Sequence, residues 1–150
     1  MEQTLIILKP DAIQRGLAGA ILQRLERRGL KIVALKMMQI DRQLAEDHYA
    51  EHQGKPFYDG LISYITAGPV IVGVLAGKDA VQITRTTVGA TNPVNAAPGS
   101  IRGDLAVETG RNLIHASDKP ETGRIEVERF FRPDELLLDY ERTNERWITE

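Results

Sequence analysis

The most strand-like stretch of the chain is Val70–Leu75, which reads V-I-V-G-V-L and follows the turn-forming pair Gly68-Pro69. A run of β-branched residues that begins after such a turn predicts a strand. Thr4–Leu8 is a second continuous apolar run, compatible with a central strand buried on both faces. Lys31–Ile40 predicts a third strand. The chain is therefore expected to fold around a sheet.

Helical patterns separate these strands. Ala18–Arg28 places its apolar residues on one helical face, and Arg42–Glu51 predicts a helix capped by the preceding aspartate. A further helix is expected to start near Phe57. Asp79 and Gln82 have the spacing of a capping box and predict the start of another helix, which carries Arg85 near its far end.

Composition limits the classes of function. A length of 150 residues predicts one domain over residues 1–150. The formal net charge of -2 argues against a general nucleic-acid or anionic-membrane binder, and the chain has no cysteine to form disulfides or thiolate metal sites. Neither a leader nor a membrane span is evident, so a cytoplasmic protein that requires no nucleic acid is expected.

Two places carry residue types that bind phosphate. Lys9 stands where the first strand gives way to Pro10, so its ammonium group could face an anionic ligand. Val88–Asp104 is long and irregular, and Thr91 and Arg102 within it offer a hydroxyl and a guanidinium suited to phosphate oxygens. A solvated strand end and a disordered linker are the respective alternatives. No glycine-rich phosphate loop occurs, so side chains would have to hold the phosphates.

One histidine lies in a setting that favours chemistry. The segment Asn112–Asp118 reads N-L-I-H-A-S-D, in which Leu113 and Ile114 are predicted to end a buried strand. His115 would then lie at the mouth of the core, substantially neutral and able to act as base, ligand or nucleophile. Glu126, eleven residues later, could orient the ring. A hydrogen-bonded structural histidine is the alternative.

Aromatic residues upstream could complete a cleft. Tyr49 and His52 are expected to point together from the end of their helix, although Tyr49 could equally pack at the core edge. Phe57 follows a Gly-Lys-Pro break, which is typical of a base-stacking platform and equally of a core residue.

Together these motifs resemble the nucleoside diphosphate kinase family along nearly the whole chain. They are L-K-P-D at 8–11, H-Y-A-E-H at 48–52 with K-P-F-Y following, T-N-P at 91–93, P-G-S-I-R-G-D at 98–104, and N-L-I-H-A-S-D at 112–118. Each is short and means little alone. Their common order and fitting spacing make the resemblance highly specific.

The resemblance implies a ping-pong reaction that maintains the pools of nucleoside and deoxynucleoside triphosphates. His115 would take the terminal phosphate of a nucleoside triphosphate, mainly ATP, become phosphohistidine, and pass the phosphate to a nucleoside diphosphate. Glu126 would hold the far ring nitrogen. Lys9 and Tyr49 would lie at the transferring group, where charge and positioning govern the rate.

The resemblance also implies how the nucleotide is held. Arg85, Thr91 and Arg102 would grip the phosphates together with Mg²⁺, and the metal would be bound mainly through the phosphates with no direct protein ligand. Asn112, with the lysine, would meet the sugar hydroxyl. Phe57 would stack on the base, and stacking of this kind accepts every base.

The implied fold is an α/β (α+β) ferredoxin-like βαββαβ sandwich, in which helices cover a four-stranded antiparallel sheet. The predicted strands fit that order, with the fourth near Leu113. Arg124–Phe131 alternates locally like a strand, although Pro120 could equally open a helix. The resemblance places Glu126 on a helix. Residues 132–150 are expected to form a C-terminal arm. An arm that ends in Trp147 and Ile148 resembles those of homo-oligomeric relatives, and favours a hexamer over a tetramer.

The chain departs from the family pattern at three positions. Ala116 stands in place of a usual glycine, which reduces backbone freedom beside the nucleophile. Thr109 stands where an apolar residue often completes the base clamp, so weaker base binding is expected. Leu105 replaces a frequent phenylalanine. None of these changes removes a catalytic group.

Two other readings stay open on the sequence. An inactive member of the same fold could serve as a scaffold, although this chain keeps His115 and its supporting residues. A metal-dependent hydrolase could use His48, Glu51 and His52, but the H-E-x-x-H arrangement is absent and no further ligand is evident.

Overall fold

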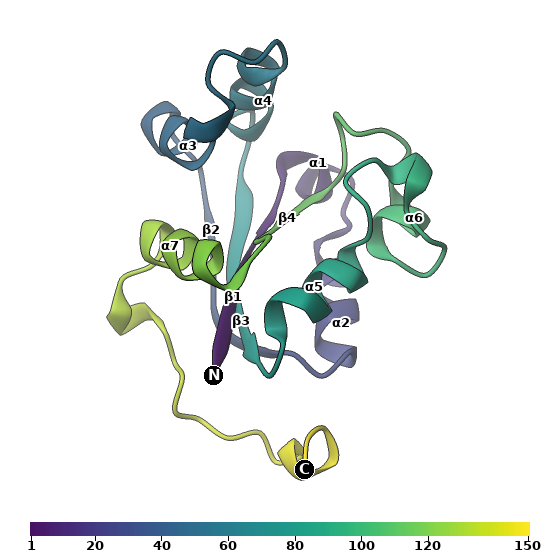
Figure 1. Ribbon diagram of the computed structural model, residues 1–150, viewed down its shortest axis with the longest axis vertical. Coiled ribbons are helices and arrows are strands. Elements are labelled where there is room, and N and C mark those ends of the chain that lie inside the picture. Colours follow the sequence, from purple (N-terminus) through teal and green to yellow (C-terminus); the bar gives the residue numbers. More distant parts are fainter.

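The computed structural model describes residues 1–150 and contains one four-stranded sheet in the order β2-β3-β1-β4, with every pairing antiparallel (Figure 1). The strands are β1 (Glu2–Leu8), β2 (Lys31–Met38), β3 (Val70–Gly77) and β4 (Ile114–Ala116). The helices are α1 (Pro10–Gln14), α2 (Ala18–Arg27), α3 (Arg42–His48), α4 (Tyr58–Ile65), α5 (Ala80–Val88), α6 (Ile101–Leu105) and α7 (Pro120–Phe130). This is the ferredoxin-like sandwich predicted from the sequence.

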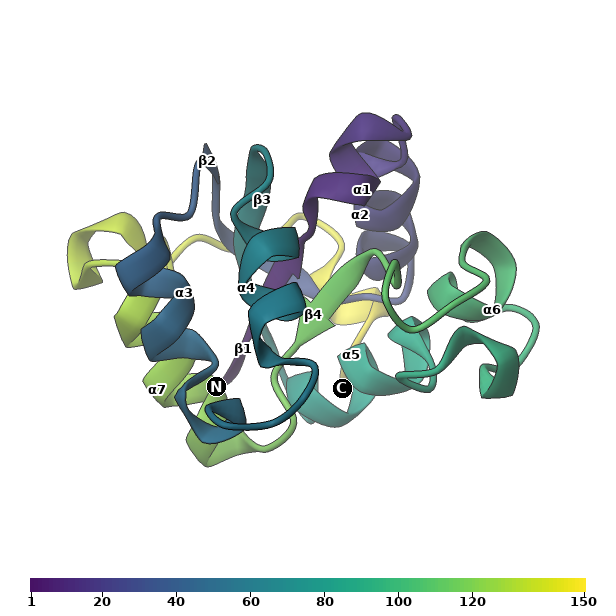
Figure 2. The same ribbon diagram turned by 90° about the horizontal axis from the view of Figure 1, so that it is seen from above.

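The apolar sequence of β1 explains why helices cover both faces of the sheet. Leu5 and Ile7 pack into a core with residues of α3, α4 and α7, whereas Ile6 and Leu8 pack on the opposite face with residues of α1, α2, α5 and α6. Figure 2 shows these two groups of helices on either side of the strands. Alternate side chains of a strand point to opposite faces, so a continuous apolar run fills two cores at once.

Helix α3 is capped by the residue that precedes it, whereas α5 is capped by a residue from another element. Asp41 caps α3 through its own side chain, which accepts a hydrogen bond from the Leu44 amide at 2.8 Å. At α5 the predicted capping box is wrong, because Asp79 adopts a left-handed conformation (φ 55°) and makes no cap. The Val81 amide instead donates to Glu2 on β1 at 2.8 Å. A side chain distant in sequence thus satisfies the free amide of the helix.

The chain around His115 differs from the prediction in two ways. β4 begins at Ile114, so His115 lies in the middle of a short edge strand and Leu113 lies outside it. The irregular stretch 88–104 contains a 3₁₀ turn, Pro93–Asn95, and the start of α6. Glu126 lies on α7, as the family resemblance implied and against the local alternation.

The residues after α7 run along the outer edge of β2 (Figure 1). The Leu137 amide donates to the Val33 carbonyl at 2.9 Å, and Lys31 Nζ donates to the Leu138 carbonyl at 3.0 Å. Trp147, near the C-terminus, is 77% exposed. No helix of the chain combines the length and the apolar character needed to cross a bilayer.

Candidate active site

A cavity of about 750 Å³ opens between β4, the start of α4 and the segment that leads into α6. Eight of the nine predicted site residues line it, and they come from both ends of the sequence: Lys9, Tyr49, Phe57, Arg85, Thr91, Arg102, Asn112 and His115. Glu126 is the exception, because it lies behind His115 and contacts the cavity only through that ring. Folding therefore brings these residues to one place.

A tight turn precedes His115 and sets the direction of β4. Leu113 has φ 74°, and the Ile114 amide donates to the Asn112 carbonyl at 2.9 Å, which closes a γ-turn. Such a turn is strained for a residue with a side chain and persists only where surrounding contacts hold it. Asp11 supplies one contact, since its Oδ2 accepts from the Leu113 amide at 3.2 Å.

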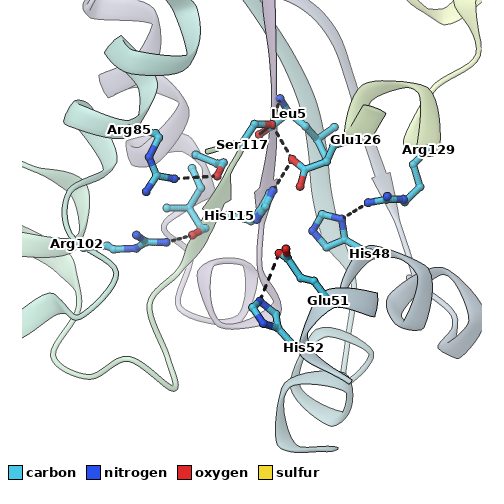
Figure 3. Close-up of polar contacts among 12 residues, drawn as sticks. Leu5, His48, Glu51, His52, Arg85, Arg102, His115, Ser117, Glu126 and Arg129 are labelled. Carbon is cyan, nitrogen blue, oxygen red and sulfur yellow. Dashed lines mark hydrogen bonds and ion pairs between the residues drawn. The ribbon is translucent and has the colours of Figure 1, made fainter. Parts of the chain in front are cut away.

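Arg102 supplies further contacts to this turn. Its guanidinium, on α6, donates to the carbonyl oxygens of Asn112 at 3.1 Å and of Ile114 at 2.5 Å, on either side of the turn, and to that of Gly89 at 3.1 Å. Figure 3 draws one of these bonds, from Arg102 to a carbonyl oxygen of β4. Arg102 is only 7% exposed, and burial, helped by the charge of Arg85, lowers its pKa to about 10. The side chain thus bears a charge at the cavity wall and also fixes the backbone before His115.

Contacts on one side of the ring determine the tautomer of His115. Nε2 lies 2.9 Å from Glu126 Oε1, and Ser117 Oγ donates to the same oxygen at 2.7 Å (Figure 3). An ionised carboxylate only accepts hydrogen bonds, so Nε2 carries the proton and Nδ1 keeps a free lone pair. Burial alone would raise the pKa of Glu126, but its hydrogen bond and charge contact with His115 and the bond from Ser117 lower it overall. Glu126 therefore stays ionised and leaves Nδ1 available as a nucleophile.

Lys9 is a buried cation that has lost much of its hydration. It is 7% exposed, and its Nζ donates to Asn112 Oδ1 at 2.8 Å. Burial, followed by the charge of Arg102, lowers the pKa of Lys9 to about 7, while Asp11 opposes the shift. An anionic ligand would restore the favourable partner that burial has removed. Asn112 is itself fixed, because its amide donates to the Thr91 carbonyl at 3.0 Å.

Two tyrosines line the cavity and differ in their partners. The Tyr64 hydroxyl donates to Asp11, whose other oxygen supports the γ-turn. The Tyr49 hydroxyl is buried and has no hydrogen-bond partner. Burial and the negative charge of Glu126 raise the pKa of Tyr49, so this hydroxyl stays protonated. It is therefore a free donor at the cavity wall.

The opposite end of the cavity is open. Phe57, just before α4, is 53% exposed, and its ring lies 5.3 Å from that of His52 in an edge-to-face arrangement. Thr109 and Pro56 also line the cavity. The exposed face of Phe57 offers a flat apolar surface, whereas Thr109 adds a hydroxyl.

The lining of the cavity contains no carboxylate. Lys9, Arg85, Arg102 and Arg111 make the wall cationic, which suits a polyanion, and the wall offers no carboxylate ligand to a hard divalent cation. The hydrolase set of His48, Glu51 and His52 does not come together as a metal group. The side chains that lie within 4.8 Å of one another are those of His48, His115 and Glu126.

Four residues of the site were not predicted as such, and one of them, Arg111, lines the cavity with its Cζ 4.7 Å from the centroid of the Tyr64 ring. Asp11 and Ser117 lie within the motifs L-K-P-D and N-L-I-H-A-S-D, so their position beside Lys9 and His115 was the available signal. Tyr64 lies in α4, where nothing in the local sequence distinguishes it from a core residue. Its contact with Asp11 depends on how α4 packs near α1.

Comparisons with known proteins identify the family of the chain. The family model for nucleoside diphosphate kinase matches residues 2–136. The chain is 62% identical to a nucleoside diphosphate kinase of Roseiflexus sp. (strain RS-1) over 150 residues, 100% of both chains. It is 53% identical to that of Archaeoglobus fulgidus, over 100% of this chain and 99% of the relative.

Two solved structures give the same result. The halophilic nucleoside diphosphate kinase of Halobacterium salinarum, determined in complex with CDP, superposes with a TM-score of 0.96 at 49% identity and covers 99% of each chain. A Babesia bovis family protein superposes with a TM-score of 0.94 at 42% identity, over 99% of this chain and 100% of that chain. The chain therefore belongs to the nucleoside diphosphate kinase family, whose enzymes transfer the γ-phosphate of one nucleotide to another.

Proposed function

We propose that His115 carries the phosphate in a ping-pong reaction between a nucleoside triphosphate and a nucleoside diphosphate. The observation that carries this proposal is the hydrogen bond of 2.9 Å between His115 Nε2 and Glu126, in a ring that lines the cavity. In the first half-reaction Nδ1 attacks the γ-phosphorus, an N–P bond forms, the P–O bond to the β-phosphate breaks, and the diphosphate leaves. In the second, a β-phosphate oxygen of another diphosphate attacks the phosphorus and releases His115.

The cations of the cavity are proposed to hold the phosphates. Arg85 and Arg102 would bind phosphate oxygens, with the Thr91 hydroxyl as a further donor. Lys9 and the unpartnered Tyr49 hydroxyl would act at the transferring group, where negative charge is spread over the phosphoryl oxygens. These donors are already positioned, so little reorganisation is needed during transfer.

Mg²⁺ is the proposed cofactor. The cavity wall has no carboxylate to bind it, so the phosphates gripped by Arg85, Thr91 and Arg102 would hold the ion, whose charge offsets part of theirs. The residues of the cavity fit this arrangement because they supply cations and a hydroxyl around the phosphates and leave the ion to phosphate oxygens and water.

Sugar and base are proposed to lie toward the open end. Asn112 and Lys9 would hydrogen-bond the sugar hydroxyl, and Phe57 would stack on the base. The Halobacterium salinarum relative was solved with CDP, a pyrimidine nucleotide. Stacking on an exposed phenylalanine ring does not discriminate between bases, which supports a broad nucleotide specificity.

The first experiment measures the intact mass of the protein after incubation with ATP and Mg²⁺ and no acceptor, and again after GDP is added. We expect the gain of one phosphate that is lost in acid, disappears with GDP as GTP forms, and is absent in His115→Ala. A folded protein that gains no mass and forms no GTP would favour an inactive scaffold of the same fold. Omission of Mg²⁺ tests the cofactor in the same assay.

The assembly and setting of the chain are also proposals. We infer a single domain over 1–150 with a C-terminal arm of about 132–150, in a homo-oligomer for which a hexamer is favoured over a tetramer. Exposed apolar side chains on β2 and the arm, namely Leu35, Met37 and Trp147, support self-association. Sedimentation velocity distinguishes hexamer from tetramer. Cell fractionation tests the expected cytoplasmic location.

A further inference from the structure

A second histidine packs against His115 from outside the cavity. His48 ends α3, is 8% exposed and does not line the cavity. Its ring centroid lies 4.6 Å from that of His115, and the two ring planes meet at 77°. Edge-to-face packing at this distance is a specific aromatic arrangement that limits the rotation of both rings. The orientation of the His115 imidazole therefore depends on His48 as well as on Glu126.

Arg129 determines where the proton of His48 lies. Its Nη1, on α7, donates to His48 Nδ1 at 3.0 Å (Figure 3). A guanidinium has only donors, so Nδ1 is unprotonated and the proton of the neutral ring lies on Nε2. Burial, with the nearby charges of His115 and Arg129, also lowers the pKa of His48 well below its ordinary value. The ring is therefore neutral at physiological pH.

The surroundings of His48 contain both charges and rings. The titratable and charged groups that face it are Lys9 after β1, Tyr49 and His52 after α3, His115 on β4, and Glu126 and Arg129 on α7. Only Arg129 forms a hydrogen bond with the His48 side chain. The cations among these groups disfavour a second positive charge on His48.

The Nε2–H group of His48 has no acceptor although it is buried. An unpartnered buried N–H costs about 1–3 kcal/mol, which an apolar side chain in the same position would avoid. Phe130, whose ring lies 5.4 Å from that of His48, is such an apolar neighbour. Ligand atoms of His48, His115 and Glu126 all lie within 4.8 Å of one another. The polar ring of His48 therefore packs against His115 and Glu126 even though its unpartnered Nε2–H group destabilises the fold.

We propose that His48 and Arg129 form a positioning pair for His115, an inference that rests on the proposed nucleophilic role of that residue. The His48 ring holds the His115 imidazole so that Nε2 meets Glu126 and Nδ1 faces the cavity. Arg129 keeps His48 in its neutral form. A positively charged His48 would repel the positive charge that His115 acquires as it bonds to phosphorus, whereas a neutral His48 does not. Neither residue contacts the nucleotide.

The test compares the wild-type protein with His48→Ala and His48→Phe. The rate constant for phosphorylation by ATP and Mg²⁺ is measured by rapid quench, and ADP affinity by calorimetry. We expect His48→Ala to slow phosphorylation at least tenfold, because small misplacements of a reacting group have effects of about that size, with unchanged ADP affinity. His48→Phe keeps the ring and should recover most of the rate. A general loss of folded protein would lower the amount of phosphoenzyme and leave the rate constant unchanged.

A second measurement examines the role of Arg129 without using activity. Nitrogen-15 NMR should find His48 protonated on Nε2 in the wild-type protein, and Arg129→Met should shift it toward the other tautomer or the charged form. Wild-type protonation on Nδ1, no change in Arg129→Met, a wild-type rate in His48→Ala, or a His48→Phe rate as low as that of His48→Ala would overturn the proposal. If the wild-type protein forms no phosphohistidine, the proposed function fails instead, and the NMR result still reports on His48.

Discussion

The two ends of the cavity differ in how firmly their side chains are held. Side chains beside β4 are fixed by contacts with distant parts of the chain, whereas Phe57 at the other end is partly exposed to solvent. Arg102 is 7% exposed and donates to three carbonyl groups; Phe57 is 53% exposed and packs against His52 on one side. The first end surrounds the proposed path of the phosphate. The second would receive the base.

This difference agrees with the demands of the reaction. Phosphoryl transfer depends on charge and position, so small displacements at the β4 end should have large effects on rate. Base binding by stacking depends on area and tolerates displacement. A kinase that accepts several nucleotides can therefore combine a rigid phosphate end with a loose base end. The predictions below test that contrast.

The largest effect is expected from Arg102→Met. This change removes a buried charge and its hydrogen bonds to three carbonyl groups, so unfolding in urea should show a loss of about 3 kcal/mol. The γ-turn would also relax, and activity should fall at least about 100-fold. Arg85→Met is the matched control, because Arg85 makes a single carbonyl contact at 3.4 Å. It should lose activity but little stability, and equal losses of stability would contradict the structural role of Arg102.

A smaller effect is expected from Glu126→Gln. The amide can still accept the proton of His115 Nε2, but its negative charge is lost, so kcat should fall by about tenfold or more while KM changes little. Steady-state kinetics at saturating ADP measure this. Unchanged kcat would mean that the carboxylate charge does not assist His115.

Glu126 also makes a prediction for stability against pH. Its pKa is lowered in the folded protein, so it stabilises the fold above the ordinary pKa of a glutamate, and that contribution is lost as pH falls through the lowered value. Thermal unfolding between pH 6 and about 3 should therefore show a shallower acid destabilisation in Glu126→Gln than in the wild-type protein. Parallel curves would contradict this assignment.

At the open end, Phe57→Ala should weaken binding of ADP, GDP, CDP and UDP by about tenfold each, since stacking contributes about 1–3 kcal/mol per base. The kcat value should change little, because the ring is remote from His115. Phe57→Tyr keeps the stacking surface and should behave like the wild-type protein. Loss of affinity for purines alone would mean that this end discriminates between bases.

The smallest expected effect is the uptake of a fraction of a proton by Lys9 when ADP binds. Because the pKa of Lys9 is lowered to about 7, much of Lys9 is neutral at pH 8, and a bound phosphate should restore its proton. Calorimetry of ADP binding in buffers of different ionisation enthalpy should therefore detect proton uptake at that pH, and affinity should fall as pH rises above 7. Lys9→Arg, which stays charged, should take up no proton. Equal uptake in both proteins would assign the proton to another group.

Much of the fold was predictable because its signals are local. The apolar runs that form β1, β2 and β3 are continuous in sequence. The strand that begins at Val70 is predicted from its own residues, without knowledge of the strands that pair with it. Glu126 shows the limit of such signals. Its local alternation allowed a strand, Pro120 equally allowed a helix, and the family resemblance favoured the helix that the structure contains.

The sequence by itself determined which residue types are present and in what order: a histidine between apolar residues, dispersed cations, a phenylalanine after a turn, and no cysteine. Tertiary structure alone decided how they act. The γ-turn at Leu113 exists because Asp11 and Arg102, from separate elements, bind its backbone, and the Glu2 carboxylate replaces the cap expected from Asp79. The proton positions of His115 and His48 depend on Glu126 and Arg129 of α7. Strain, tautomer and burial are properties of contacts between distant segments, and a linear pattern of residues does not contain those contacts.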